Sequence, residues 1–171
     1  MNLHFRLSKV SSFIFLWIII STSFMLQVTE FARTYLSERT FGILTIILLI
    51  IPISAFAAFI IFRKRLPLSR VLVISALLIM ALLLAMHLEY PVEKIHILEF
   101  IILGWFVTRD SIKANSMISG ILLACIFSLA AGALDEAFQI ILPYRVFDWR
   151  DISLNAFGGL EGVVLYLLSE K

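Results

Sequence analysis

Residues 41–62 read FGILTIILLIIPISAFAAFIIF, a stretch without a single charged side chain. A helix needs about 20 predominantly apolar residues to cross the hydrocarbon core of a bilayer, so this stretch predicts a transmembrane helix. Its proline, Pro52, is compatible with such a helix because neighbouring helices can re-satisfy the backbone carbonyl that it leaves free. Residues 10–28, 71–88 and 117–134 are similarly apolar and predict three more helices of this kind.

Two further stretches are apolar but interrupted by polar side chains. Residues 95–107 contain His96 and Glu99, and residues 152–168 contain Asn155 and Glu161. Ionisable side chains inside a membrane usually face the interior of a helix bundle or a wet cavity. Both stretches are therefore expected to be helices with their polar side turned inward. The predicted fold is an all-α, polytopic transmembrane helical bundle with about six spans.

The composition supports this interpretation. Hydrophobic residues make up 61% of the chain and charged residues 15%, and the mean hydropathy is +1.04. A soluble domain has about 45–50% apolar and about 25% charged residues. The composition therefore excludes a secreted or cytosolic globular domain, a disordered tail and a nucleic-acid binder. Six spans nearly use up the length, so residues 1–171 are expected to form a single integral membrane domain.

Basic residues predict how the bundle is oriented. Arg6 and Lys9 precede the first apolar stretch, which is longer than a signal-peptide core and lacks a small-residue cleavage site, so we expect a retained first span. Residues 63–70 contain a tight cluster of Lys and Arg between the second and third spans. Cytoplasmic loops carry an excess of such residues, so both termini are predicted to be cytoplasmic.

In this orientation, polar residues of the last three predicted spans lie at the same depth in the membrane. The fourth span begins, the fifth ends and the sixth begins at the outer face, and each brings polar side chains there. Candidate catalytic groups are His96, Glu99 and Glu136, and candidate ligand-binding groups are Gln139, Arg145, Asp148, Asp151 and Asn155. One interpretation is a functional cavity, and the other is a structural polar network that closes the bundle. Asp148 and Asp151 also fit helix N-caps.

Glycine and tryptophan predict packing rather than chemistry. Gly158 and Gly162 form a small-xxx-small pair, which lets a neighbouring helix backbone approach closely. Trp105 and Trp149 are expected to be anchors at the membrane interface, where tryptophan is enriched.

Two motifs of polar, proline and glycine residues at fixed spacing lie within residues 87–168. The positions are Asp135, Glu136, Gln139, Pro143, Arg145, Asp151, Asn155, Gly158 and Gly162, preceded by Glu93, Lys94, His96, Phe100, Leu103 and Gly104. With these motifs, the C-terminal part of the chain resembles the VanZ-like family of small bacterial membrane proteins, which is named for a protein associated with teicoplanin resistance. The resemblance implies a multi-pass protein of the bacterial inner membrane with a role in the cell envelope, including a link to glycopeptide resistance. It supplies no reaction.

Three functions stay open. The first is binding of an envelope lipid or lipid-linked precursor, with Arg145 paired to a phosphate in an outward-facing polar cavity. The second is a hydrolase that uses a metal ion or a His–Glu pair on such a lipid, although the sequence has no recognised metal-ligand spacing and identifies no cofactor. The third is a small transporter or a structural membrane protein. The expected partners are membrane lipids, with no nucleic acid, and a homo-oligomer is left open.

Overall fold

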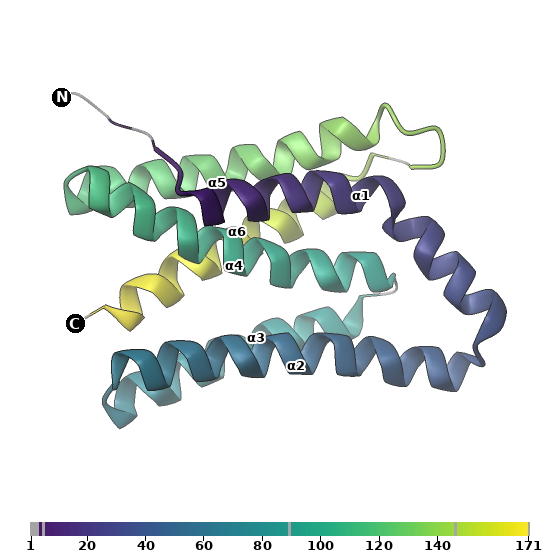
Figure 1. Cartoon of the computed structure of the whole chain (residues 1–171), viewed down its shortest axis with the longest axis horizontal. Helices are drawn as coiled ribbons and strands as arrows, with labels where there is room; N and C mark the ends of the chain where they lie inside the picture. Colours follow the sequence, from purple (N-terminus) through teal and green to yellow (C-terminus); the bar gives the residue numbers. More distant parts are fainter. Residues whose placement is uncertain (1–3, 5, 89, 146, 171) are drawn as a thin grey trace.

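The computed structural model of the chain describes residues 4, 6–88, 90–145 and 147–170, which form six α-helices and no strand (Figure 1). The all-α helical bundle expected from the sequence is therefore confirmed. The helices are α1 (Lys9–Tyr35), α2 (Glu38–Lys64), α3 (Leu68–His87), α4 (Pro91–Ala114), α5 (Met117–Gln139) and α6 (Trp149–Ser169).

Most of the described helices begin at a side-chain cap. The hydroxyl groups of Ser8, Ser37 and Ser116 each accept a hydrogen bond from a backbone N–H in the first turn of α1, α2 and α5. The carboxylate of Asp148 does the same for α6. Such caps satisfy N–H groups that have no partner inside the helix, which explains why these helices begin where they do.

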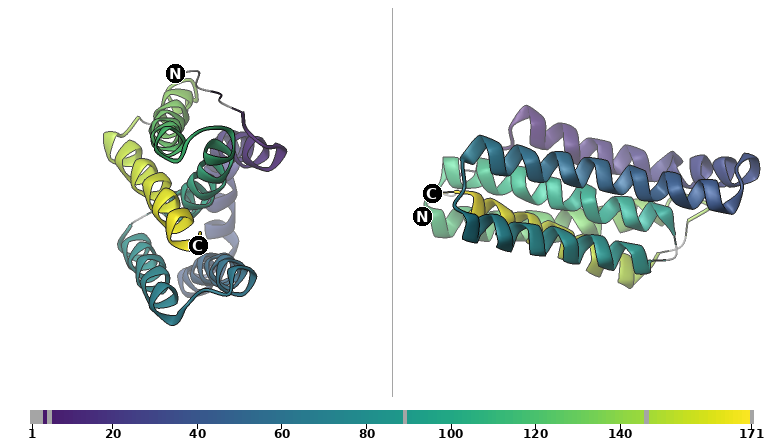
Figure 2. Two further views of the ribbon diagram at one scale, coloured as in Figure 1. Left: turned by 90° about the vertical axis from the view of Figure 1, so that its left-hand side faces the viewer. Right: turned by 90° about the horizontal axis from the view of Figure 1, so that it is seen from below.

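The helices run back and forth, so both chain termini lie at one end of the bundle (Figure 1). The opposite end holds the connections α1–α2, α3–α4 and α5–α6, and we call it the distal end. Viewed along the bundle, the α2–α3 hairpin lies on one side and α5 on the other (Figure 2). Helix α4 packs against all five of the other helices, with its largest interface on α6.

Five of the six helices are long and apolar enough to cross a membrane, and α4 is the exception. Its polar side chains, which include His96 and Asp110, lower its mean hydropathy. Yet α4 forms the centre of the bundle, and its Phe100, Ile101 and Leu103 are completely buried. A central helix does not face lipid, so its polar groups need partners in the protein rather than an apolar surface.

Glycines let α4 and α6 approach closely. A Cβ atom added at Gly162 would lie 2.1 Å from the carbonyl oxygen of Ile101, and one at Gly158 would lie 2.7 Å from that of Ile97. On the facing helix, a Cβ atom at Gly104 would lie 2.1 Å from the carbonyl oxygen of Gly159. The two backbones are therefore in direct contact, which fixes how α6 presents its polar first turns to α4.

The expectation that Trp105 anchors the protein at the membrane interface is wrong. Trp105 is only 3% exposed and packs edge-to-face against Phe56, Phe59 and Tyr166 in the core between α2, α4 and α6. Because α4 is surrounded by other helices, its large aromatic side chain fills the interior. Trp149, at the distal start of α6, is exposed and remains in a position that suits an interfacial anchor.

Candidate functional site

A network of polar side chains lies near the distal end, and His96 of α4 connects two of its carboxylates. The imidazole is buried, and its Nδ1 lies 2.9 Å from Oε2 of Glu99. Its Nε2 lies 3.8 Å from Oδ2 of Asp135 on α5 and 3.5 Å from Oγ1 of Thr22 on α1. The imidazole is thus held between acids from two helices.

Asp135 is the centre of the network and is completely buried. One carboxylate oxygen accepts from Oγ1 of Thr22 at 2.6 Å. The other accepts from Nε2 of Gln139 at 3.3 Å and from Nδ2 of Asn155 at 3.4 Å. A buried carboxylate without such partners destabilises the folded protein. Through its hydrogen bonds, Asp135 links its own helix α5 to α1 and α6.

A second branch of the network leads from Glu136 to Arg145. Gln139 donates from Nε2 to Oε1 of Glu136 at 2.5 Å and accepts at Oε1 from Nε of Arg145 at 2.7 Å. The other Glu136 oxygen accepts from the backbone N–H of Asp148 at 3.1 Å, which ties the α5–α6 loop to α5. Among the residues that the structure describes, none accepts a hydrogen bond from the terminal nitrogens of Arg145. The guanidinium is therefore positioned at Nε and keeps its outer edge available.

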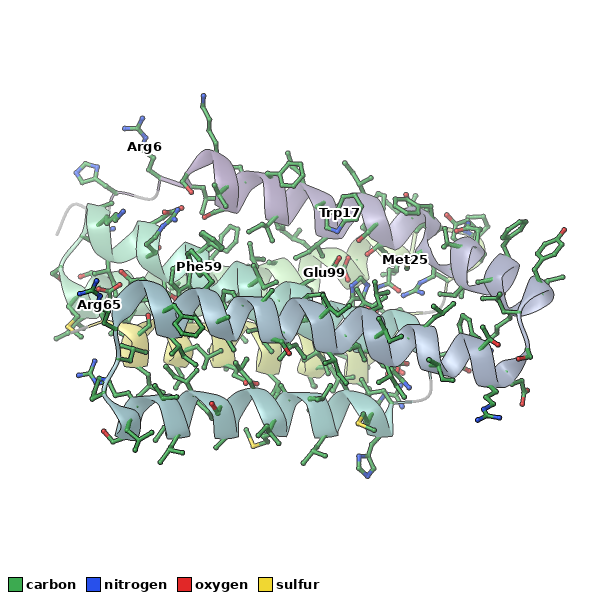
Figure 3. All side chains as sticks on the ribbon, turned by 60° about the horizontal axis from the view of Figure 1, so that its bottom comes forward. Arg6, Trp17, Met25, Phe59, Arg65 and Glu99 are labelled. Atoms are coloured by element: carbon green, nitrogen blue, oxygen red, sulfur yellow. The ribbon has the colours of Figure 1, made fainter. Side chains whose placement is uncertain are left out.

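Helix α1 contributes to the site, although the sequence did not indicate it. Besides Thr22, its Trp17 donates from Nε1 to Oε1 of Glu99 at 2.8 Å, and Figure 3 shows the two side chains close to each other. The hydroxyl of Tyr144 in the α5–α6 loop donates to the backbone carbonyl of Ser23. The one signal for these contacts is the sequence Ser-Thr-Ser at residues 21–23, in the middle of an apolar stretch.

The structure separates the predicted site residues into two groups. His96, Glu99, Glu136, Gln139, Arg145 and Asn155 join the hydrogen-bonded network. The side chains of Asp148 and Asp151 lie outside this network. Asp148 Oδ1 accepts from the backbone N–H of Arg150, as expected of an N-cap. Asp151 lies with its Oδ1 4.0 Å from Nε of Arg150, beyond hydrogen-bond distance.

A pocket of about 380 Å³ opens beside the network, and we call it the distal pocket. It is formed by the C-terminal half of α1, the start of α4, the α5–α6 loop and the start of α6. Its charged lining residues are Glu30, Arg33, Glu93, Arg145, Asp148 and Asp151. Arg145 lines the pocket and also joins the network through its side chain. His96, Glu99 and Glu136 lie behind the pocket wall, not in it.

Two oxygen atoms of the pocket's acids lack hydrogen-bond donors. Glu93 accepts from Arg150 at Oε1, at 2.5 Å, but its Oε2 is shielded from solvent without a donor among the described residues. The Oδ1 of Asp151 is in the same situation. Buried acceptors are normally satisfied, so these two atoms, in residues that line the pocket, have unused hydrogen-bonding capacity.

The site does not resemble a metal centre in the described part of the chain, where no three His, Cys, Asp or Glu side chains converge as metal ligands. Three acids of the network instead have protein hydrogen-bond donors: Trp17 for Glu99, Thr22 for Asp135 and Gln139 for Glu136. The arrangement positions a guanidinium group at the edge of a pocket.

Comparisons with known proteins agree with the sequence motifs. Residues 92–170 match the VanZ/LLP1 family model. No curated protein and no solved structure matches the chain. The matched residues include nearly all of α4 and the whole of α5 and α6, and hence all of the network except the donors from α1. The three C-terminal helices of this membrane protein are thus a VanZ-like domain, and this part of the chain, residues 92–170, is assigned to the VanZ/LLP1 family.

Proposed function

We propose that the distal pocket binds the phosphate-bearing headgroup of an envelope lipid or of a lipid-linked envelope precursor. The observation that carries this proposal is the state of Arg145: Gln139 fixes its Nε at 2.7 Å, while its terminal nitrogens have no acceptor among the described residues. A guanidinium is a planar fork that binds phosphate oxygens through two parallel hydrogen bonds. A guanidinium that is already fixed at its Nε is preorganised for such a ligand, which lowers the entropic cost of binding.

In this proposal the buried network is a positioning device. Asp135 and Glu136 hold Gln139 through its amide nitrogen, and Gln139 holds Arg145. On the side of α4, the imidazole of His96 bonds to Glu99 at Nδ1 and lies with its Nε2 3.8 Å from Oδ2 of Asp135. The acids lining the pocket would accept hydrogen bonds from the hydroxyl or amine groups of a headgroup. An envelope role follows from the outer-leaflet location predicted for this end of the bundle, and glycopeptide resistance through a bound envelope lipid is the corresponding cellular function.

Removal of the guanidinium tests this function directly. The Arg145→Ala variant is expected to bind phospholipid or lipid-linked precursor roughly 10- to 100-fold more weakly, since a hydrogen bond to a charged group contributes about 1.5–3 kcal/mol. Binding is measured by native mass spectrometry of the purified chain with a titrated lipid. Arg39→Ala is the matched control, because Arg39 is an exposed distal arginine at the start of α2 that does not line the pocket. Equal binding by the two variants would refute the proposal.

The orientation is tested separately. A reporter inserted in the loop at Arg145 is expected to be active only on the outer side of the inner membrane. A cytoplasmic reporter would move the pocket to the inner leaflet and remove the link to lipid-linked precursors displayed outside. In cells, Arg145→Ala is expected to abolish any protection against teicoplanin that the wild-type chain confers, with membrane insertion unchanged.

A further inference from the structure

An apolar groove of about 410 Å³ lies between α1 and α2, next to the distal pocket. Met25 and Val28 of α1 line one side, and Leu44, Leu48 and Ile51 of α2 line the other. Met25 lies between the two ribbons in Figure 3. The groove opens toward the outside of the bundle, where Leu48 and Ile51 are exposed. In a bilayer this opening faces the acyl chains of lipids.

The groove and the distal pocket are adjacent. Thr29 of α1 and Pro91, the first residue of α4, line both of them. Arg33 lines the pocket, and its guanidinium lies over the ring of Phe41, 5.3 Å from the centroid. Phe41 in turn lines the groove. A cation therefore lies where the apolar compartment meets the polar one, which is where the phosphate of a phospholipid lies relative to its chains.

The pocket also offers acceptors that an ammonium group would satisfy. Oε2 of Glu93 and Oδ1 of Asp151 are both shielded from solvent and lack a donor among the described residues. An ammonium group has three N–H donors and no acceptor. A headgroup with a phosphate alone would match Arg33 and Arg145 but would leave these carboxylate oxygens unsatisfied, at a cost in binding.

We propose that the ligand is an aminophospholipid whose acyl chain lies in the α1–α2 groove, whose phosphate lies between Arg33 and Arg145, and whose ammonium group donates to Glu93 and Asp151. This inference rests on the proposed function and names the chemical class of its ligand. The groove keeps the chain in apolar surroundings while the headgroup is in the pocket. Because lipid tails outside the protein are equally apolar, the headgroup contacts determine the selectivity.

Photocrosslinking tests where the acyl chain lies. The purified chain is placed in nanodiscs with phosphatidylethanolamine that carries a diazirine on one acyl chain, and the labelled residues are mapped by mass spectrometry. Labelling of Leu48 and Ile51 is expected to exceed, at least fivefold, the labelling of Ile126, an equally exposed residue on α5 away from the groove. The bulky variant Leu48→Trp is expected to abolish the excess, and Ile126→Trp is expected to leave it unchanged. Uniform labelling means annular lipid only and overturns the proposal.

Competition tests the headgroup. Unlabelled phosphatidylethanolamine is expected to displace the probe at a concentration at least tenfold lower than phosphatidylglycerol or a polyprenyl phosphate. Asp151→Asn is expected to remove this preference while phosphatidylglycerol binding is retained, and Glu93→Gln supplies a second variant. Stronger displacement by phosphatidylglycerol or polyprenyl phosphate, or an unchanged preference in both variants, overturns the proposal.

The two proposals fail in distinguishable ways. Loss of phosphatidylglycerol binding in Arg145→Ala, together with an unchanged headgroup preference in Asp151→Asn and Glu93→Gln, leaves the phosphate site intact and refutes only the aminophospholipid. Unchanged binding of every lipid by Arg145→Ala refutes the proposed function itself.

Discussion

The hydrogen bond from Thr22 to Asp135 allows a sharp test of whether α1 is part of the site. Thr22→Val keeps the shape of the side chain and removes only its hydroxyl. That hydroxyl lies 2.6 Å from Oδ1 of a completely buried carboxylate and 3.0 Å from the backbone carbonyl oxygen of Ile18, and its single proton is donated across the shorter contact. The substitution therefore removes the short donor of Asp135 without leaving a large cavity.

The magnitude follows from what Asp135 keeps. Its two other side-chain donors in the described part of the chain, Gln139 and Asn155, lie at 3.3 and 3.4 Å from the other carboxylate oxygen. Among these residues, none replaces the hydrogen bond that Oδ1 loses with Thr22. A hydrogen bond to a charged group contributes about 1.5–3 kcal/mol. We expect Thr22→Val to lower the free energy of unfolding by this amount.

Thr108→Val is the matched control. Thr108 is also completely buried, but within the described residues its hydroxyl donates only to the carbonyl of Gly104 in its own helix. Both partners of that bond belong to one turn of α4, and a neutral hydrogen bond contributes only about 1 kcal/mol. Reversible unfolding in bicelles is expected to show the smaller loss for this control.

A double-mutant cycle with Asp135→Asn identifies the partner. Residues in direct contact show coupling energies of about 0.5–3 kcal/mol. Strict additivity of Thr22→Val and Asp135→Asn, or equal losses in Thr22→Val and Thr108→Val, would refute the view that α1 is docked through this carboxylate.

Three further predictions concern the frame around the site. Gly162→Ala is expected to lower the melting temperature sharply, since its Cβ would lie 2.1 Å from the Ile101 carbonyl oxygen. Gly42→Ala is the control: its Cβ would have no atom within 4 Å, so the same melting assay is expected to show a neutral or stabilising effect. Asp110→Asn weakens the 2.8 Å bond from the backbone N–H of Ser8, so hydrogen exchange in the first turn of α1 is expected to accelerate, with exchange in α5 unchanged. Glu161→Leu is expected to raise the free energy of unfolding by about 1–3 kcal/mol. The reason is that neither carboxylate oxygen of this buried residue has a hydrogen-bond partner in the described part of the chain. A destabilised variant would show that the carboxyl group has a partner of its own.

The helical bundle was predictable because lipid imposes a simple rule on sequence. Long stretches without charge must be helices, and residues 41–62 obey this rule throughout. The central position of α4 was harder to predict. Its mixture of polar and apolar residues is compatible with a helix at the membrane interface, a loosely packed helix or a fully enclosed one. The contacts with five neighbouring helices, which the sequence does not reveal, show that it is enclosed. Trp105 illustrates the consequence, since the same residue type suits an interface or a core.

The candidate site was predictable where helical spacing and motif agreed. His96 with Glu99, and Glu136 with Gln139, recur at a spacing of three and share a helix face. Thr22 was not predictable in this way, because a hydroxyl in an apolar helix is satisfied by its own backbone and has no obligatory partner. Asp148 was ambiguous from the sequence, since an acid before a helix suits a cap as well as a ligand site.

The requirement for α1 follows from the hydrogen-bond inventory of the VanZ-like domain. Within that domain, Glu99, Asp135 and Glu136 bring three carboxylates, which as charged groups only accept hydrogen bonds, into one buried region. The side-chain donors Gln139 of α5 and Asn155 of α6 bond to Oδ2 of Asp135 and to Glu136. Among the described residues of the domain, neither supplies a hydrogen bond to Oε1 of Glu99 or to Oδ1 of Asp135. Trp17 and Thr22 of α1 supply these two bonds. Because an unsatisfied buried carboxylate oxygen is costly, α1 completes the polar network, and the same helix forms one wall of both the distal pocket and the groove.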